Sequence, residues 1–408
     1  MAENIHITFW NYNRFEDYNP QMLRDWVECG MTTPNAPMFD MNSSKELHEK
    51  FLQMLNDAQE LGVQLILQVG QLFVGNYYRG EETYRKYINE FNEKYGNHPA
   101  IYGIYVGEEP GSNHVEYFQG VRILREIMPH LRVYTNMGSI ERTERMTLHG
   151  DETLTDWCCD FVKTSGTDII GFGDYTSMLC DDSGVYEHFH NLKEFTAAGK
   201  AAGADIWATM LSSAHEYYRI PTEDDYRWQL NTCVACGCKG IVWFRLYDKL
   251  VAGDYRGSPI DEFGMKTIHY YDLARVQKKF NIHYGKIFAH LDHQVSYGFG
   301  VSYGNYKYFV PGCNDLVSNV TGRLGMVSFF KGDDGYDYVV LLNTDQHKSG
   351  HLGITFSENV EKVETVYFNG EKLDTKCERN GKIGTMDCGT ECFAPGQISL
   401  MKVTRVQK

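Results

Sequence analysis

The chain has 408 residues, 42% of them hydrophobic and 14% aromatic, which is enough apolar surface for a large core and for more than one domain. Its formal net charge is −15 without a cluster of Lys and Arg, which excludes nucleic acid as a partner. No apolar run reaches the roughly 20 residues of a membrane helix, and the first residues lack a signal-peptide pattern. As given, the sequence predicts a cytoplasmic protein, or a secreted or periplasmic one if a signal segment has been removed.

Short apolar runs alternate with amphipathic helical patterns up to about residue 292. We expect strands at residues 5–10, 32–39, 63–69, 101–106, 132–136, 168–172, 205–211 and 240–246. Helical patterns between them include residues 44–61, 81–95, 113–128, 152–164, 185–202 and 222–236. Eight strand-helix units predict an α/β fold, a (β/α)8 TIM barrel over residues 1–292. A doubly wound open sheet is the alternative, but no Gly-x-Gly-x-x-Gly turn follows the first run.

The pattern changes after a long helical stretch at residues 262–291. Strand-like runs then follow at residues 295–303, 323–330, 336–343, 351–356, 363–368 and 398–403. Turn signals such as Asn369-Gly370 and Pro395-Gly396 separate them, and no helical pattern lies among them. We therefore predict a small all-β domain, an antiparallel sandwich, over residues 293–408, with a structural rather than a catalytic role.

The cysteines favour reduced thiols over a disulfide framework, because their number, 11, is odd and they are spread through a large chain. The spacing of Cys233, Cys236 and Cys238 resembles a metal motif, but no second Cys or His pair stands at zinc-site spacing. We expect these thiols to pack in the core. No metal and no cofactor are predicted.

Polar and aromatic residues follow the expected strands, where the chain reaches the carboxyl end of the barrel. Such ends assemble the active site of a TIM barrel. The candidates, in chain order, are Trp10, Asn11, Gln68, Gln71, Glu108, Glu109, Asn136, Asp174, Tyr175, Ser212, Ser213, His215, Glu216, Trp243, Arg245 and Asp248. Aromatic rings stack on sugar faces, and amides and carboxylates pair with hydroxyls. The set predicts a site for an oligosaccharide or glycoside; the oligomeric state is not predicted.

Several of these residues have a structural alternative. Trp10 and Trp243 suit the core as well as a sugar platform, and His215 suits an ordinary loop. Asp174 suits the cap of a turn, a common role of Asp. The case for a site therefore rests on the joint occurrence of these residues at the strand ends.

The sequence Glu108-Glu109-Pro110, at the end of the fourth expected strand, resembles a motif of (β/α)8 glycoside hydrolases. In the large clan with catalytic groups on strands four and seven, the fourth strand ends in Asn-Glu-Pro, and its Glu is the general acid/base. The resemblance implies this role for Glu109, with Glu108 at the Asn position. A group of bacterial glycosidase-like proteins carries an acidic residue there, and its likeness extends over almost the whole chain, through segments similar to residues 98–111, 168–175, 219–223 and 393–396.

The seventh strand departs from that clan. Residues 206–210 resemble the strand that usually ends in Thr-Glu, so Met210 stands where the nucleophile is expected. A thioether cannot fill that role. The second carboxylate would then be Glu216, Asp174 or Glu108, with Glu216 the first choice because it follows the strand closely.

Three functions are weighed. The first is a glycosidase in which Glu109, its pKa raised by burial and by Glu108, protonates the glycosidic oxygen; retention or inversion is left open. The second is a catalytically degenerate carbohydrate-binding barrel, suggested by Met210. The third is a sugar isomerase or lyase, which the missing metal-ligand set at the strand ends disfavours.

Overall fold

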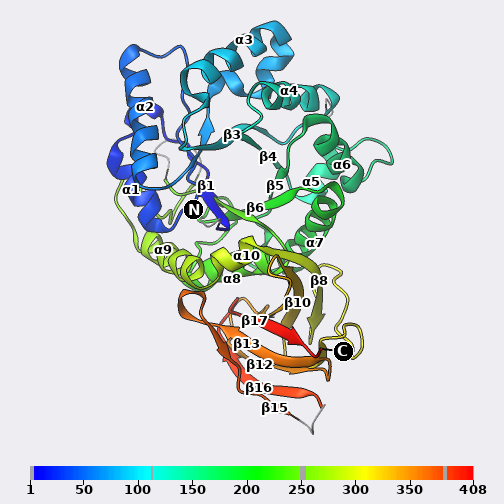
Figure 1. Cartoon of the computed structure of the whole chain (residues 1–408). Helices are drawn as coiled ribbons and strands as arrows, with labels where there is room; N and C mark the ends of the chain where they lie inside the picture. Colours follow the sequence, from blue (N-terminus) through cyan, green and yellow to red (C-terminus); the bar gives the residue numbers. More distant parts are fainter. Residues whose placement is uncertain (1–3, 112–113, 249–253, 380–383, 408) are drawn as a thin grey trace.

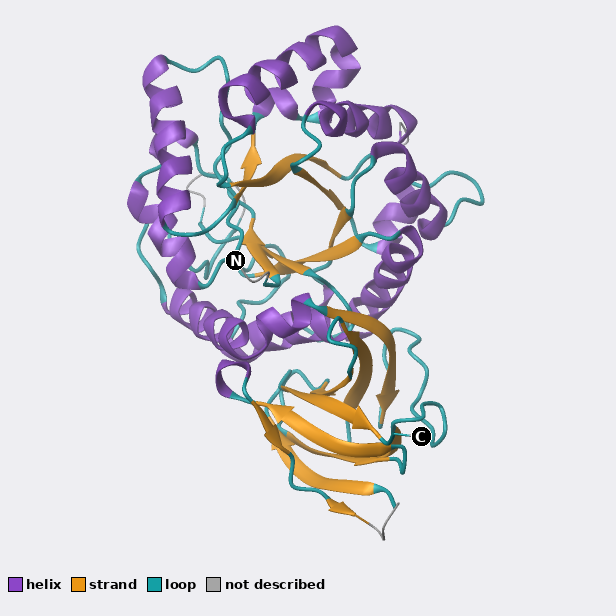
Figure 2. Cartoon of the chain, in the orientation of Figure 1, coloured by secondary structure: helices purple, strands orange, loops and turns teal. Residues whose placement is uncertain are grey.

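The computed structural model describes residues 4–111, 114–248, 254–379 and 384–407. Its first part is a curled parallel sheet of seven strands in the order β1-β7-β6-β5-β4-β3-β2. The strands are β1 (His6–Phe9), β2 (Leu65–Gln68), β3 (Ile101–Glu108), β4 (Arg132–Met137), β5 (Ile169–Gly173), β6 (Asp205–Leu211) and β7 (Gly240–Phe244). Figure 2 shows them as a ring surrounded by helices. The prediction of a TIM-barrel-like α/β fold is confirmed.

The segment 32–39 closes the ring between β1 and β2, but it does not form the regular strand that we predicted. It makes three isolated parallel bridges, Asn35 with Ile66, Met38 with Arg14 and Phe39 with Val69. Pro34 and Pro37 lie in this segment and have no N–H for a ladder, and Pro37 stands between the two bridges to Ile66 and Val69, so the pairing with β2 is interrupted. The barrel thus has one irregular side, and the cavity described below opens there.

Helices cover the ring, and several of them begin at a capping side chain. The helices are α1 (Pro20–Cys29), α2 (Lys45–Glu60), α3 (Glu81–Phe91), α4 (His114–Ile127), α5 (Ile140–Met146), α6 (Leu154–Ser165), α7 (Val185–Ala202), α8 (Glu223–Ala235), α9 (Ile268–Phe280) and α10 (Lys286–Ala289). The side chain of Ser44 accepts from the Leu47 N–H at the start of α2, and Thr222 and Asp225 form a capping box on α8. No described helix is long and apolar enough to span a bilayer.

Alternation along the strands divides the barrel residues between two cores. The inner core fills the ring and contains Trp10, Ile66, Tyr105, Tyr134, Ile169, Trp207 and Val242. The outer core lies between the sheet and the helices and includes Met210 and Trp243. The side of the sheet on which a residue lies therefore decides whether it can reach the mouth.

The second part of the chain is a pair of antiparallel sheets, as predicted. One sheet has the order β14-β13-β17-β11-β10-β8 and the other β15-β16-β12-β9. The strands are β8 (Leu291–Phe299), β9 (Val317–Thr321), β10 (Gly325–Gly332), β11 (Asp337–Asn343), β12 (Gly350–Phe356), β13 (Val360–Val366), β14 (Lys372–Asp374), β15 (Glu378–Arg379), β16 (Met386–Phe393) and β17 (Ile398–Arg405). They share their own hydrophobic core, and Figure 1 shows them against the α8 side of the barrel.

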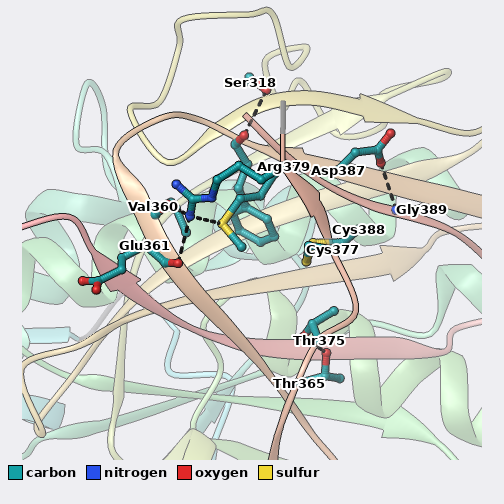
Figure 3. The surroundings of a disulfide bond; sticks show 12 residues. Ser318, Val360, Glu361, Thr365, Thr375, Cys377, Arg379, Asp387, Cys388 and Gly389 are labelled. Carbon is teal, nitrogen blue, oxygen red and sulfur yellow. Dashed lines mark hydrogen bonds between the residues drawn. A yellow bond between two sulfur atoms is a disulfide. The ribbon is translucent and has the colours of Figure 1, made fainter. Parts of the chain in front are cut away.

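A disulfide joins Cys377 to Cys388 across the β15–β16 edge of the smaller sheet (Figure 3). Both residues pack against the core of the sandwich, and the neighbouring Arg379 donates through Nη2 to the Val360 carbonyl at 3.0 Å. The prediction of reduced thiols is wrong for these two residues. The other nine cysteines are free, and Cys233 and Cys236 are buried in the core as expected.

The sandwich contacts the barrel through α8 and through the helical turn Asn281–Gly285, which lies against Phe368–Gly370. The Trp228 indole N–H donates to the Thr344 carbonyl at 3.0 Å, and Asn231 Nδ2 donates to the Gly396 carbonyl at 2.8 Å. Gly396 has a φ of 64°, and a Cβ there would lie 2.2 Å from the Cα of Trp228. The close approach of the two parts therefore requires glycine at this position.

Candidate active site

A cavity of about 850 Å³ opens at the carboxyl ends of β1, β2 and β3. Its wall combines aromatic rings, side-chain amides and carboxylates, and it includes Trp10, Asn11, Tyr12, Asn13, Glu16, Asp40, Gln68, Gln71, Phe73, Asn76, Tyr105 and Glu108. Of the residues predicted to form the site, the cavity gathers those that follow the first and third expected strands and, from the fourth, Glu108 but not Glu109. This composition suits a ligand with apolar faces and many hydroxyls.

Glu108 lines this cavity because the end of β3 is irregular. The pairing of β3 with β4 shifts between Tyr105 and Glu108, and the intervening Gly107 has a φ of 135°, a conformation that suits glycine. Glu108 then pairs with Asn136 on β4. The shift places the Tyr105 ring in the inner core and the Glu108 carboxyl at the cavity.

The protonation of the Glu108 carboxyl depends on its burial and on two neighbouring charges. Burial raises the pKa of Glu108, the negative charge of Glu109 raises it further, and Arg142 opposes the change. Glu108 in turn adds to the rise that burial causes in the pKa of Tyr12 and of Tyr105. The site therefore favours a protonated carboxyl at Glu108.

Glu109 has different surroundings. Its φ is 45°, its N–H donates to the Asn136 carbonyl at 2.6 Å, and its carboxylate forms an ion pair with Arg142 on α5. Its side chain is 35% exposed and is not part of the cavity wall. The structure thus raises the pKa of the neighbouring Glu108 and places a cation beside Glu109.

Asn136 belongs to a polar layer directly below the mouth. Its Oδ1 accepts from Thr209 Oγ1 at 2.9 Å and from the Tyr134 hydroxyl at 3.2 Å. These bonds join β4 to β6 through the inside of the barrel. They fix the Asn136 amide beside Glu108, its partner in the pairing of β3 with β4.

Asp174 points away from the mouth, as the structural alternative anticipated. Its Oδ1 accepts from the Thr176 N–H at 3.1 Å, and its Oδ2 lies 3.2 Å from His188 Nδ1 on α7. The carboxylate is 1% exposed, so substrate cannot reach it. The prediction that Asp174 supplies the second carboxylate is corrected: it holds the turn after β5 and contacts α7.

The exit of β6 brings no carboxylate into the barrel. Thr209 points inward to Asn136, whereas Met210 is fully buried in the outer core, so Met210 does not occupy the mouth position that the sequence assigned to it. Ser212 Oγ donates to the Arg245 carbonyl at 3.0 Å, and Ser213 Oγ accepts from the Arg245 N–H at 3.2 Å. Both serines thus hydrogen-bond to the backbone directly after β7.

Glu216 lies further along the same loop and is exposed to solvent. It has a φ of 49°, and its N–H donates to Asp254 Oδ1 at 2.7 Å. It is not part of the cavity wall. Glu216 stands on a loop and not at a strand end, so the strand geometry does not set its distance from Glu108. Its role as the second carboxylate stays a prediction.

Trp243 is a core residue, which corrects its prediction as a sugar platform. Its indole is 0% exposed and packs on the outer face of β7, where Nε1 donates to Gln277 Oε1 at 3.0 Å. The alternation of β7 turns Val242 and Phe244 inward instead. Trp10, by contrast, lies in the inner core and borders the cavity.

A second group of rings forms the opposite half of the mouth. Tyr175 stacks on Phe244 at 5.3 Å, and His215 stacks on Tyr255 at 5.2 Å between ring centroids. Burial lowers the pKa of His215, which favours its neutral form. Tyr255, on the loop after β7, was missed by the sequence reasoning, because no strand pattern positions it.

Three further predicted residues act partly as structural supports. Asn11 Nδ2 donates to the Asn35 carbonyl at 2.9 Å, and Gln68 Nε2 donates to the Ala36 carbonyl at 3.1 Å. These bonds hold the irregular segment 32–39, while both side chains still border the cavity. Asp248 is half-buried and accepts a hydrogen bond from the Ser258 hydroxyl. Within the described residues, no group of three His, Cys, Asp or Glu side chains could hold a metal ion.

No family model and no curated protein matches the chain. Solved structures do match its fold. A protein described as a glycoside hydrolase aligns over 98% of this chain and 92% of its own length, at a TM-score of 0.58 and 12% identity. A family 39 glycoside hydrolase from the gut symbiont Bacteroides cellulosilyticus aligns over 99% of this chain and 81% of its own, at a TM-score of 0.52 and 10% identity. The chain shares its fold with TIM-barrel glycoside hydrolases.

A beta-galactosidase from the psychrophilic Marinomonas ef1 aligns over 68% of this chain, at a TM-score of 0.51 and 10% identity. The chain spans 60% of the length of that enzyme. At such identities the likeness concerns the fold alone. The chemistry of this chain has to be argued from its own residues.

Proposed function

We propose that this protein is a glycoside hydrolase whose general acid is Glu108. The observation that carries the proposal is the contrast within the acidic pair: Glu108 lines the cavity with a raised pKa, while Glu109 is ion-paired with Arg142. A general acid must be protonated near the working pH and must reach the leaving oxygen. Glu108 lines the cavity, where Glu109 does not, and its raised pKa moves it toward the protonated form.

The reaction follows from this placement. Glu108 gives its proton to the glycosidic oxygen as the bond between the anomeric carbon and that oxygen breaks, and the bonding electron pair leaves with the oxygen as an alcohol. The oxygen of a water molecule then bonds to the anomeric carbon, and the water proton goes to a carboxylate. The products are a free sugar and the alcohol, and one water is consumed.

The carboxylate that assists the water is not assigned by this geometry. Glu16 and Asp40 border the same cavity as Glu108, and Glu216 stands on the β6–α8 loop. Asp40 Oδ1 is held by the Asn42 N–H at 2.8 Å and by Gln71 Nε2. A separation from Glu108 of about 5 to 5.5 Å would fit retention, and about 6.5 to 9.5 Å would fit inversion.

Glu109, the acid/base implied by the sequence motif, is the alternative donor. Its carboxylate forms an ion pair with the Arg142 guanidinium and is not part of the cavity wall, which places it less well than Glu108 to reach a sugar bound in the cavity. In the proposal Glu109 acts on Glu108 instead, because its negative charge contributes to the raised pKa of that neighbour. The substrate of either scheme is an oligosaccharide or a glycoside.

A screen of natural oligosaccharides and aryl glycosides with the wild type tests the proposal. Hydrolysis of at least one substrate, with a loss of about 10² to 10⁴ in the Glu108→Gln variant, is the expected result. Glu109→Gln is the matched isosteric control and should retain most of the activity. The reverse ranking of the two variants would assign the acid to Glu109.

One observation favours a carbohydrate-binding barrel without hydrolysis. The exit of β6, where the related clan carries its nucleophile, presents Thr209 and two structural serines instead of a carboxylate. Under this second function, Glu108→Gln would leave sugar binding intact and no substrate in the screen would be cleaved. Calorimetric binding of the same sugars to wild type and variant separates the two functions.

A further inference from the structure

The cavity beside Glu108 extends in one direction, from the inside of the ring to the layer of helices. Its inner end is formed by Glu108 and by Trp10 and Tyr105 of the inner core. Its outer end is formed by Arg79 and by Tyr87, which lies on α3 outside the ring (Figure 1). No described residue of β4 to β7, or of the loops after them, belongs to its wall. A ligand that fills the cavity therefore leaves the mouth between the loops after β1 and β2.

The backbone under this cavity joins the two loops that form its walls. Arg14, on the loop after β1, bridges to Met38, and the neighbouring Phe39 bridges to Val69, directly after β2. The Arg14 side chain is held in turn by Asp17, with Nε 3.0 Å from Oδ2. The walls are thus positioned before a ligand binds, which lowers the entropic cost of binding a long one.

Aromatic rings follow one another along the cavity. The Trp10 ring meets the Tyr105 ring edge to face, with 4.8 Å between centroids, and Tyr105 meets Phe73 in the same way at 5.5 Å. Phe73 is half-buried on the loop after β2, and the half-buried Tyr87 stands at the outer end. Such rings offer flat apolar faces to successive sugar units.

Polar side chains in the cavity wall keep hydrogen-bonding capacity. Gln68 Nε2 donates to the Asn11 carbonyl at 3.0 Å and to the Ala36 carbonyl at 3.1 Å, while Gln68 Oε1 accepts no hydrogen bond from any described residue. Arg79 is exposed and donates to Asn76 Oδ1 at 3.5 Å, and it has no carboxylate in ion-pair contact among the described residues. Both side chains can therefore bind hydroxyl groups of a chain that passes them.

We propose that the cavity binds a chain of at least three sugar units, so that the substrate is an oligosaccharide and not a small glycoside. One unit lies beside Glu108 at Trp10 and Tyr105, the next packs on Phe73, and a third packs on Tyr87. The volume of about 850 Å³ agrees with this length, since it is near the upper end of the roughly 300 to 1,000 Å³ of sites for drug-sized ligands. The inference rests on the proposed function for cleavage beside Glu108, but it concerns the length of the bound chain.

Calorimetry with the Glu108→Gln protein tests the inference without turnover. The probes are β-1,4-linked chains of glucose, galactose, mannose or xylose, each with one to four units. In a series that binds, we expect the affinity to rise by about tenfold or more from one unit to three. Adding Phe73→Leu, which keeps an apolar side chain but removes the ring, should weaken binding from two units on. Adding Tyr87→Ala should weaken binding only from three units on.

Tyr78→Ala is the matched control, because Tyr78 is a 49% exposed ring that is not part of the cavity wall. It should leave the dependence on chain length unchanged. Equal affinity for all lengths would overturn the inference while leaving the proposed function in place. A length dependence that both ring variants preserve would also overturn it, and so would a uniform loss at every length with a lower melting temperature in Tyr87→Ala. Failure of every probe to bind would count against the proposed function as well.

Discussion

Glu108 and Glu109 are adjacent in sequence, yet Glu108 lines the barrel cavity while Glu109 pairs with Arg142 on α5. The irregular pairing at the end of β3 and the positive φ of Gly107 and Glu109 separate the two carboxyls. The two groups remain close enough for the charge of Glu109 to affect the pKa of Glu108. The proposed acid and the charge that raises its pKa are thus neighbours in the sequence.

This relationship predicts the pH dependence of hydrolysis. Glu108 must be protonated to act, so kcat/KM should fall as the pH rises through its raised pKa. Arg142→Gln removes a charge that lowers this pKa and should move the descending limb to higher pH. Glu109→Gln removes a charge that raises the pKa and should move the limb to lower pH. If the descending limb moves in the same direction in both variants, that result would contradict the arrangement of the three charges.

The two tryptophans at strand ends should respond differently to substitution. Trp243→Ala empties a site in the outer core and should lower the free energy of unfolding by about 3 to 5 kcal/mol, with unchanged sugar affinity of the folded protein. Trp10→Ala removes part of the cavity wall and should weaken sugar binding as well. Chemical denaturation and calorimetry on both variants measure the difference. Weaker binding in Trp243→Ala alone would contradict the placement of both residues.

Stability should decrease in mild acid. Burial lowers the pKa of His293 to about 4, and Lys200 and Lys239 add to this effect against Asp292. The unfolded chain takes up a proton near pH 6.5, so the free energy of unfolding should fall between pH 6.5 and pH 4, on the order of 3 kcal/mol for this group. His6, with a pKa lowered to about 4, should act in the same direction. His293→Gln should flatten the pH profile of denaturant unfolding; an unchanged profile would contradict this account.

The sandwich over residues 293–408 is expected to support the barrel without contributing a catalytic group. Gly396→Ala should disturb its contact with α8, because the new Cβ would meet the Trp228 backbone. Gly335→Ala is the control, since it also has a positive φ but meets no atom within 4 Å. We expect a clearly lower melting temperature and aggregation for Gly396→Ala, and a smaller loss from backbone strain for Gly335→Ala. A soluble, fully active fragment 1–292 would contradict the supporting role.

The barrel and the sandwich could be predicted from the sequence because apolar periodicity reports burial directly. The helix at Val185–Ala202 and the cap at Ser44 agree with the expected positions. Segment 32–39 was predicted as a strand because its apolar residues fit one. Pro34 and the hydrogen bonds from Asn11 and Gln68 make it irregular instead. The Cys377–Cys388 disulfide was missed because Cys377 directly precedes β15 and Cys388 lies on β16, two strands that the pattern did not reveal.

The site was less predictable than the fold, because it depends on which way each side chain points. Trp243 has a ring that suits sugar binding, and Met210 stands at the sequence position expected for the nucleophile. The alternation of side chains along β6 and β7 turns both residues into the outer core. A one-residue irregularity at Gly107 decides which carboxyl of the acidic pair enters the cavity. No spacing rule contains this information, since adjacent strand residues face opposite sides unless the pairing shifts.

The most direct test of the central role of Glu108 is the dependence of kcat/KM on the leaving group in a series of aryl glycosides. An enzyme with its general acid in place protonates poor leaving groups, so its rate depends weakly on the leaving-group pKa. We expect a shallow dependence for the wild type and for Glu109→Gln, and a steep dependence for Glu108→Gln. A steep dependence in Glu109→Gln with a shallow one in Glu108→Gln would contradict the account.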